Sequence, residues 1–93
     1  MLQVRFPTKV SWPLPNGENY TVYIKRMAHK AFRHDFGAAE GAYEWARGEP
    51  KGTIYIDQSR TPMQQLDDLQ HELEHALVEW RDCWRRIMTG QAG

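Results

Sequence analysis

A long amphipathic segment in the last third of the sequence limits the folds that this chain can adopt. Thr61-Pro62, followed by Gln64, is typical of a helix N-terminus, because it combines a capping residue, an early proline and a glutamine placed for a capping box. We predict one long helix that begins there and ends before Gly90. Its apolar residues recur at helical spacing and predict a core-facing stripe: Leu66, Leu69, Leu73, Ala76, Leu77, Trp80, Trp84 and Ile87.

The first two thirds of the sequence predict short strands. Alternating, β-branched or aromatic residues indicate strands at Tyr20–Lys25, Ala42–Ala46 and Thr53–Asp57, the last two forming a hairpin. Prolines interrupt the apolar alternation at 2–12, so any strand there is short or lies at an edge. A short helix is expected at 27–36. The predicted fold is a single α+β domain over residues 1–93, with a small antiparallel sheet packed on the long C-terminal helix.

Composition excludes several classes of function. The chain has 93 residues, a formal net charge of zero and charged residues spread along its length, which argues against nucleic-acid binding. No segment approaches the roughly 20 apolar residues of a membrane span, and the N-terminus lacks a signal-peptide pattern. The single cysteine, Cys83, cannot form an internal disulfide and fits a reducing compartment. We therefore expect a cytoplasmic protein with no membrane or nucleic-acid role.

The predicted helix carries the run His71-Glu72-Leu73-Glu74-His75. Positions four apart lie on one face of a helix, so both imidazoles could offer a ring nitrogen to one Zn²⁺. Glu72 directly follows the first histidine, where the H-E-x-x-H pattern places a general base for water. On a helical projection the histidines lie roughly opposite the apolar stripe, so they face either solvent or a cleft. Asp68, Glu79 and Asp82 give that side a negative bias.

This segment resembles the zincin metallopeptidases, in particular the small gluzincin-like proteins of phages and bacteria. The shared pattern is a strand (Gly52–Asp57), a loop, and a helix bearing His-Glu-x-x-His-Ala-Leu (His71–Leu77). The resemblance implies a zincin-like fold, zinc ligation by His71 and His75, and Glu72 as catalytic base and acid. It also implies an extended peptide substrate that pairs with the strand at Thr53–Asp57 or with its hairpin partner.

The third protein ligand that zincins use is not evident. Val78 and Arg81 stand where a metzincin would continue with glycine and histidine, and Glu79 lies too far along an unbroken helix to reach a metal held by the two histidines. A ligand could come from a second subunit or from the earlier half of the chain. The candidates there are His29, His34, Asp35, Glu40 and Asp57.

Two functions follow from these patterns. The first is zinc-dependent hydrolysis of peptide bonds, with an oxyanion stabiliser that could be Tyr43, Tyr55 or an arginine. The second is a non-catalytic interaction or accessory protein, phage or bacterial, that retains a metal-binding helix. The motif and its flanking strand and helix favour the first function, which is the one we expect. The small size and the missing third ligand are the arguments for the second. The sequence does not define the oligomeric state.

Overall fold

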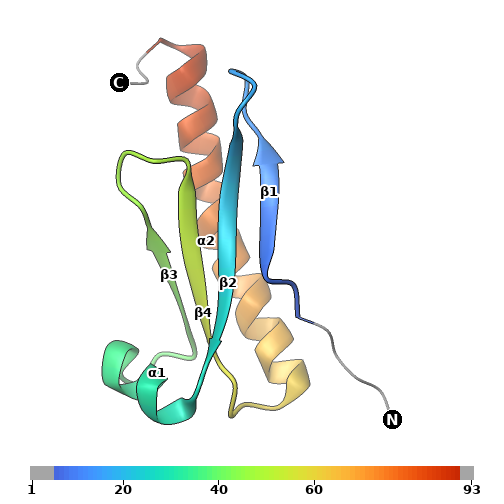
Figure 1. Ribbon diagram of the computed structural model, residues 1–93, viewed down its shortest axis with the longest axis vertical. Coiled ribbons are helices and arrows are strands. Elements are labelled where there is room, and N and C mark those ends of the chain that lie inside the picture. Colours follow the sequence, from blue (N-terminus) through green and yellow to red (C-terminus); the bar gives the residue numbers. More distant parts are fainter. Residues whose placement is uncertain (1–5, 91–93) are drawn as a thin grey trace.

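The structure, a computed structural model, describes residues 6–90 and has the α+β class that the sequence predicts (Figure 1). A long helix runs along one face of a four-stranded sheet. The elements follow one another as β1 (Lys9–Pro13), β2 (Asn19–Met27), α1 (His29–Phe36), β3 (Gly41–Trp45), β4 (Lys51–Asp57) and α2 (Pro62–Met88). Each predicted strand and both predicted helices therefore have a counterpart, with boundaries shifted by a few residues.

The sheet is mixed, so the prediction of an antiparallel sheet is wrong for its central pair. The strand order is β1-β2-β4-β3, and β2 runs parallel to β4, from Thr21 opposite Lys51 to Met27 opposite Asp57. The β1–β2 and β3–β4 pairs are antiparallel, which confirms the predicted hairpin. Strands β2 and β4 take the interior positions, and β4 buries Ile54 and Ile56 fully. Strand β3, whose residues are half-buried or exposed, lies at an edge.

The core lies between the sheet and α2. Alternate residues of the two central strands point to the helix, as the period of two requires. Each fully buried aliphatic side chain there stabilises the fold by about 1.5–3 kcal/mol relative to its exposed state. On the opposite face, α1 packs through Phe36 against Tyr55, with ring centroids 5.0 Å apart. The main cluster comprises Leu14, Tyr20, Val22, Ile24, Ile54, Ile56, Leu69 and Ala76.

Helix α2 begins as predicted. The Thr61 side chain accepts a hydrogen bond from the Gln64 backbone N–H, and the Gln64 side chain accepts one from the Thr61 backbone N–H. This capping box satisfies two of the donors that a helix N-terminus leaves unpaired. The helix is 27 residues long and stops at Met88, before Gly90. No helix within residues 6–90 combines the length and apolar character needed to cross a lipid bilayer.

The face that α2 buries differs from the predicted stripe. Leu69 and Ala76 are buried as expected, but Leu77 and Trp84 are each 38% exposed, so their assignment to the core is wrong. Three polar side chains of α2 are buried instead: Gln65, Asp68 and Glu72. A hydropathy pattern cannot predict this rotation, because it depends on polar partners supplied by other parts of the chain.

Two of these buried polar residues anchor the start of α2. The Gln65 amide donates to the Arg60 carbonyl at 2.7 Å and accepts from the Arg26 side chain at 2.9 Å. Asp68 accepts from Arg60 Nε at 2.6 Å. Paired in this way, buried polar groups avoid the desolvation cost of an unsatisfied group. They hold α2 in one rotational setting, and that setting decides which way the motif residues face.

Candidate metal centre

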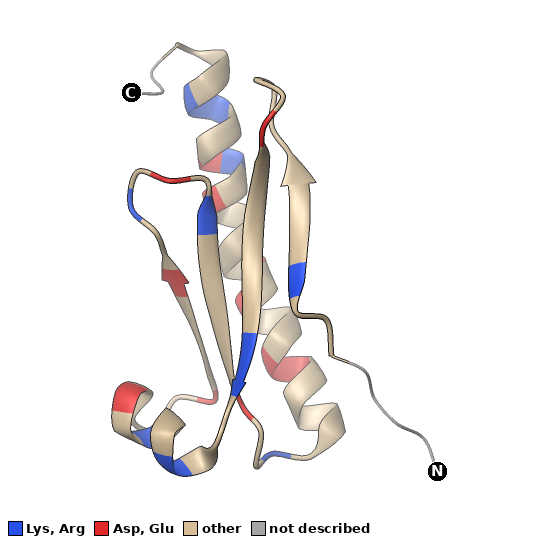
Figure 2. Cartoon of the chain, viewed as in Figure 1, with Lys and Arg blue, Asp and Glu red and all other residues tan. Residues whose placement is uncertain are grey.

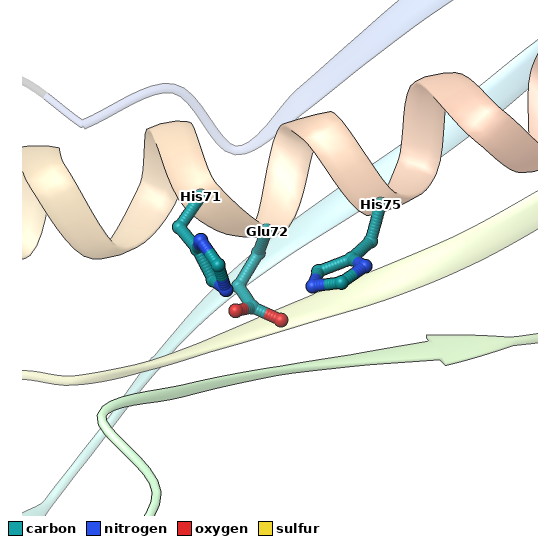
Figure 3. Close-up of side chains that lie close together, drawn as sticks. All are labelled: His71, Glu72 and His75. Atoms are coloured by element: carbon teal, nitrogen blue, oxygen red, sulfur yellow. The ribbon is translucent and has the colours of Figure 1, made fainter.

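His71, Glu72 and His75 project from one side of α2 toward the β3–β4 side of the sheet (Figure 3). One ligand atom from each of the three residues lies within 4.8 Å of the other two, and the two imidazole rings are nearly perpendicular with centroids 5.0 Å apart. Both histidines are exposed, whereas Glu72 is only 6% exposed. The helix therefore presents two accessible nitrogen ligands on either side of a recessed carboxylate.

Glu72 is recessed because the start of β3 passes directly over it. A Cβ atom at Gly41 would lie 3.1 Å from Glu72 Cγ and 3.5 Å from its Oε2. Glycine thus allows the backbone of the edge strand to approach the carboxylate closely. The catalytic candidate lies between the helix and the strand edge.

The surroundings of Glu72 change its acidity. Burial raises the pKa of its carboxyl above the usual value, and the Asp68 carboxylate acts in the same direction. Positive charge on His75 and His71 opposes these effects, but burial dominates. A carboxylate held at a raised pKa is a better proton acceptor than a solvated one, as a general base requires.

The structure does not bring any of the five candidate third ligands into the group. Within the described residues, His71, Glu72 and His75 form the only cluster of three or more possible metal ligands. His29 Nδ1 donates to Asp57 Oδ2 at 2.6 Å, so these two candidates are paired with each other. His34 and Asp35 likewise contact each other at 3.0 Å on the exposed surface of α1.

Glu40 is a candidate that shares a hollow with a motif histidine. It lines an open hollow together with His71, Glu72 and Asp68, but its carboxylate contacts Arg60 Nη2 at 3.6 Å. Arg60 also pairs with Asp68, so the negative bias predicted for the metal-binding side is smaller than the sequence indicates. Sequence reasoning missed Arg60 altogether, because it lies in a loop and outside any periodic pattern.

A second hollow borders Glu72 and distinguishes the two tyrosine candidates, because Tyr43 lines it and Tyr55 does not. Tyr43 lines it with Glu72, His75 and Glu79, whereas the Tyr55 hydroxyl donates to Glu44 on the other side of the sheet. Glu79 lies beside His75 but outside the ligand group, as the helical geometry predicts. Tyr43 is therefore the tyrosine that a substrate at the metal centre could reach.

The position of Tyr43 is fixed by two contacts. Its hydroxyl lies 2.6 Å from the hydroxyl of the fully buried Tyr20, and its ring lies over Gly52, where a Cβ would approach the Tyr43 oxygen to 2.5 Å. Burial raises the pKa of Tyr43, and the nearby Glu79 carboxylate raises it further, although the hydrogen bond with Tyr20 lowers it. The Tyr43 phenol is protonated at neutral pH, as an unshifted phenol also is, and the raised pKa extends this to higher pH.

The two strands expected to align a substrate differ in whether their backbone has an edge free to pair with a peptide. Strand β4 is paired on both sides, by β2 and β3, so its backbone cannot accept a further strand. Strand β3 has one unpaired edge among the described residues. Its hairpin partnership with β4 and its passage over Glu72 make β3 the strand at which an extended peptide could be added.

Comparisons with protein-family models, with curated proteins and with solved structures found no match for this chain.

Proposed function

We propose that this protein is a zinc-dependent hydrolase of peptide bonds. The observation that carries the proposal is the grouping of two exposed imidazoles around a recessed carboxylate, all within 4.8 Å, beside an unpaired strand edge. Nitrogen ligands one helical turn apart suit Zn²⁺, and their exposure leaves coordination positions open for water and substrate.

In this proposal His71 and His75 hold the metal and Glu72 handles the proton. Bound zinc would lower the pKa of a coordinated water toward about 7 and polarise the scissile carbonyl. Glu72 accepts the proton of the attacking water and returns it to the leaving amine nitrogen. The substrate lies extended along β3, and we assign Tyr43, which lines the hollow beside Glu72 and His75, as the donor from the sheet.

The second candidate function is a non-catalytic interaction or accessory protein with a metal-binding helix. The observation in its favour is that the described residues supply no third ligand other than Glu72 itself. If the Glu72 carboxylate coordinated the metal, it could not act as a free base. The two functions therefore assign opposite roles to one side chain.

A Glu72→Gln variant separates these roles. The protein is stripped with a chelator, titrated with zinc by calorimetry, and assayed on a broad mixture of unfolded peptides by mass spectrometry. A general-base role predicts that the variant binds zinc as the wild type does and loses hydrolysis by about 10²-fold or more. A ligand role predicts weaker zinc binding, with wild type and variant equally inert.

Single substitutions of the histidines test the metal site itself. His71→Ala and His75→Ala should each abolish measurable zinc binding, because a single remaining imidazole does not hold the ion. His34→Ala is the matched control, since His34 is exposed on α1 and lies outside the ligand group. Failure of the wild type to bind any transition metal would exclude both functions.

A further inference from the structure

A row of apolar side chains on α2 is only partly covered by the sheet. Its members recur at spacings of three or four residues, so they lie in line along the helix. Leu77 and Trp84 are each 38% exposed and Met88 is 66% exposed, whereas the other two are half-buried. We call this row the apolar seam: Leu73, Leu77, Trp80, Trp84 and Met88.

The seam lies on the flank of α2 away from the metal centre. At about 100° per residue, Leu77 and Trp84 project roughly opposite His75. Trp80 is fixed on the β1 side, where its ring packs 5.8 Å from Trp12 and its Nε1 donates to the Pro13 carbonyl at 2.9 Å. Beyond it, a hollow opens over the last turns of α2, lined by Trp80, Arg81, Trp84, Arg85 and Met88.

We propose that the apolar seam binds the same seam of a second copy of this chain, with the two α2 helices antiparallel about a twofold axis near Trp80. The spacing of the seam is self-complementary in this arrangement. Leu77 of each copy lies opposite Trp84 of the other, and Leu73 lies opposite Met88. The hollow beside Trp84 accepts the smaller leucine side chains, so large residues meet small ones.

Charge supports the antiparallel orientation. Figure 2 shows basic residues concentrated in the C-terminal turns of α2 and acidic residues along its earlier turns. Glu74 and Arg85 border the seam on the same flank, and the antiparallel register brings Glu74 of one copy close to Arg85 of the other, twice per dimer. A parallel arrangement would instead place Glu74 and Arg85 of the two copies on opposite sides of the interface, so they could not pair. Among residues 6–90 of the single chain, the Arg85 guanidinium has one ion-pair contact, a loose one of 3.8 Å with Asp82.

The antiparallel register also makes a prediction about Arg81, which lies near the twofold axis of the proposed dimer. Arg81 borders the hollow close to Trp80, so the two copies of its guanidinium group come near each other in the dimer. Their repulsion opposes association. Arg81→Ala should therefore strengthen the dimer, whereas removal of a surface arginine elsewhere, such as Arg33 on α1, should not affect it.

The first test is a concentration series by sedimentation velocity and multi-angle light scattering. The wild type should shift from monomer to dimer as the concentration increases through the micromolar range. Trp84→Glu and Leu77→Glu should each weaken dimerisation by about tenfold or more, because they place a charge in the apolar contact. Val78→Glu is the matched control: Val78 is 54% exposed on the same helix but lies off the seam, so this variant should dimerise as the wild type does.

The second test addresses the register. Glu74→Arg alone and Arg85→Glu alone should each weaken the dimer, and the double variant should restore it. Circular dichroism and thermal unfolding verify that every variant is folded. A wild type that stays monomeric throughout the series, or a double variant no better than the single ones, would overturn the proposal. Equal weakening by Val78→Glu would also overturn it.

Discussion

Gly41 and Glu72 are in direct contact across the boundary between the edge strand and the motif helix. The backbone of β3 comes so close to the carboxylate that an added methyl group would lie 3.1 Å from Glu72 Cγ. The position of the proposed base therefore depends on a residue without a side chain, in a different element of the fold.

Gly41→Ala should reduce hydrolysis without removing the metal. The new methyl group displaces the Glu72 side chain by a few tenths of an ångström, and misplacing a reacting group by a fraction of an ångström to an ångström can cost about ten- to a hundredfold in rate. Zinc affinity should change little, because the three atoms nearest to the new methyl group all belong to Glu72. Parallel measurement of kcat and of zinc binding tests this, and a joint loss of both would show that the substitution disturbs the whole helix.

Gly48→Ala, in the distant β3–β4 turn, is unsuitable as a control for Gly41→Ala, because the φ of 80° at residue 48 strains any residue other than glycine. Ala42→Ser, one position further along β3, is preferable.

Glu72→Gln should stabilise the metal-free protein at neutral pH. Burial raises the folded-state pKa of this carboxyl above its unfolded value of about 4.3. The stability that Glu72 contributes is therefore present below that value and is lost as the pH rises through the higher folded-state pKa. Urea unfolding in the presence of a chelator should show the variant more stable at pH 7 and the two proteins converging near pH 4. A difference that does not depend on pH would contradict the raised pKa.

Asp57→Asn should destabilise the protein most at neutral pH. Burial would raise the pKa of Asp57, but hydrogen bonds from His29 and from the backbone N–H and hydroxyl of Ser59 outweigh it, so the net pKa is lowered. A lowered carboxyl pKa gives stability that is present above the unfolded value of about 3.9 and is lost as the pH falls through the folded-state pKa. Loss of hydrogen bonds to a charged group costs about 1.5–3 kcal/mol, measurable by denaturant unfolding at pH 7. His29→Ala should cost less, because both Ser59 bonds remain.

Gly52→Ala should destabilise the fold through Tyr43. The methyl group would come within 2.5 Å of the tyrosine oxygen and 2.7 Å of its Cε1 atom, so the ring must move and its hydrogen bond with Tyr20 is strained. Overpacking of this kind typically costs about 1–3 kcal/mol. In a Tyr43→Ala background the same substitution should cost much less. Unfolding free energies for the four proteins of this double-mutant cycle measure the coupling, and additive effects would show that Tyr43 is not the obstacle.

The C-terminal helix was predictable because its signals are local. The Thr61–Gln64 capping box, the early proline and Gly90 define both ends, and the structure confirms them. The β3–β4 hairpin was predictable for the same reason, since a turn separates two alternating segments. The spacing of His71 and His75 also follows from helical geometry alone.

The remaining features depend on contacts that no local pattern contains. The position of β4 between β2 and β3 depends on a pairing between strands that are far apart in the sequence. If each strand is assumed to pair with the next one along the chain, the expected sheet is an antiparallel meander instead. The rotation of α2, which buries Asp68 and leaves Trp84 exposed, depends on Arg60 in the preceding loop. Whether zinc binds, and whether Glu72 acts as a base, remain predictions.

The parallel pairing of β2 with β4 also affects how the chain reaches its native state. Its partners, such as Val22 and Gly52, are separated by the whole of α1 and β3, so closing this loop costs entropy before any ladder hydrogen bond forms. The β3–β4 hairpin and α2 form from neighbouring residues and can assemble early. We therefore expect docking of the β1–β2 hairpin onto these elements to be the slow step. Until it occurs, the edge of β4 that pairs with β2 would be open to pairing with another chain.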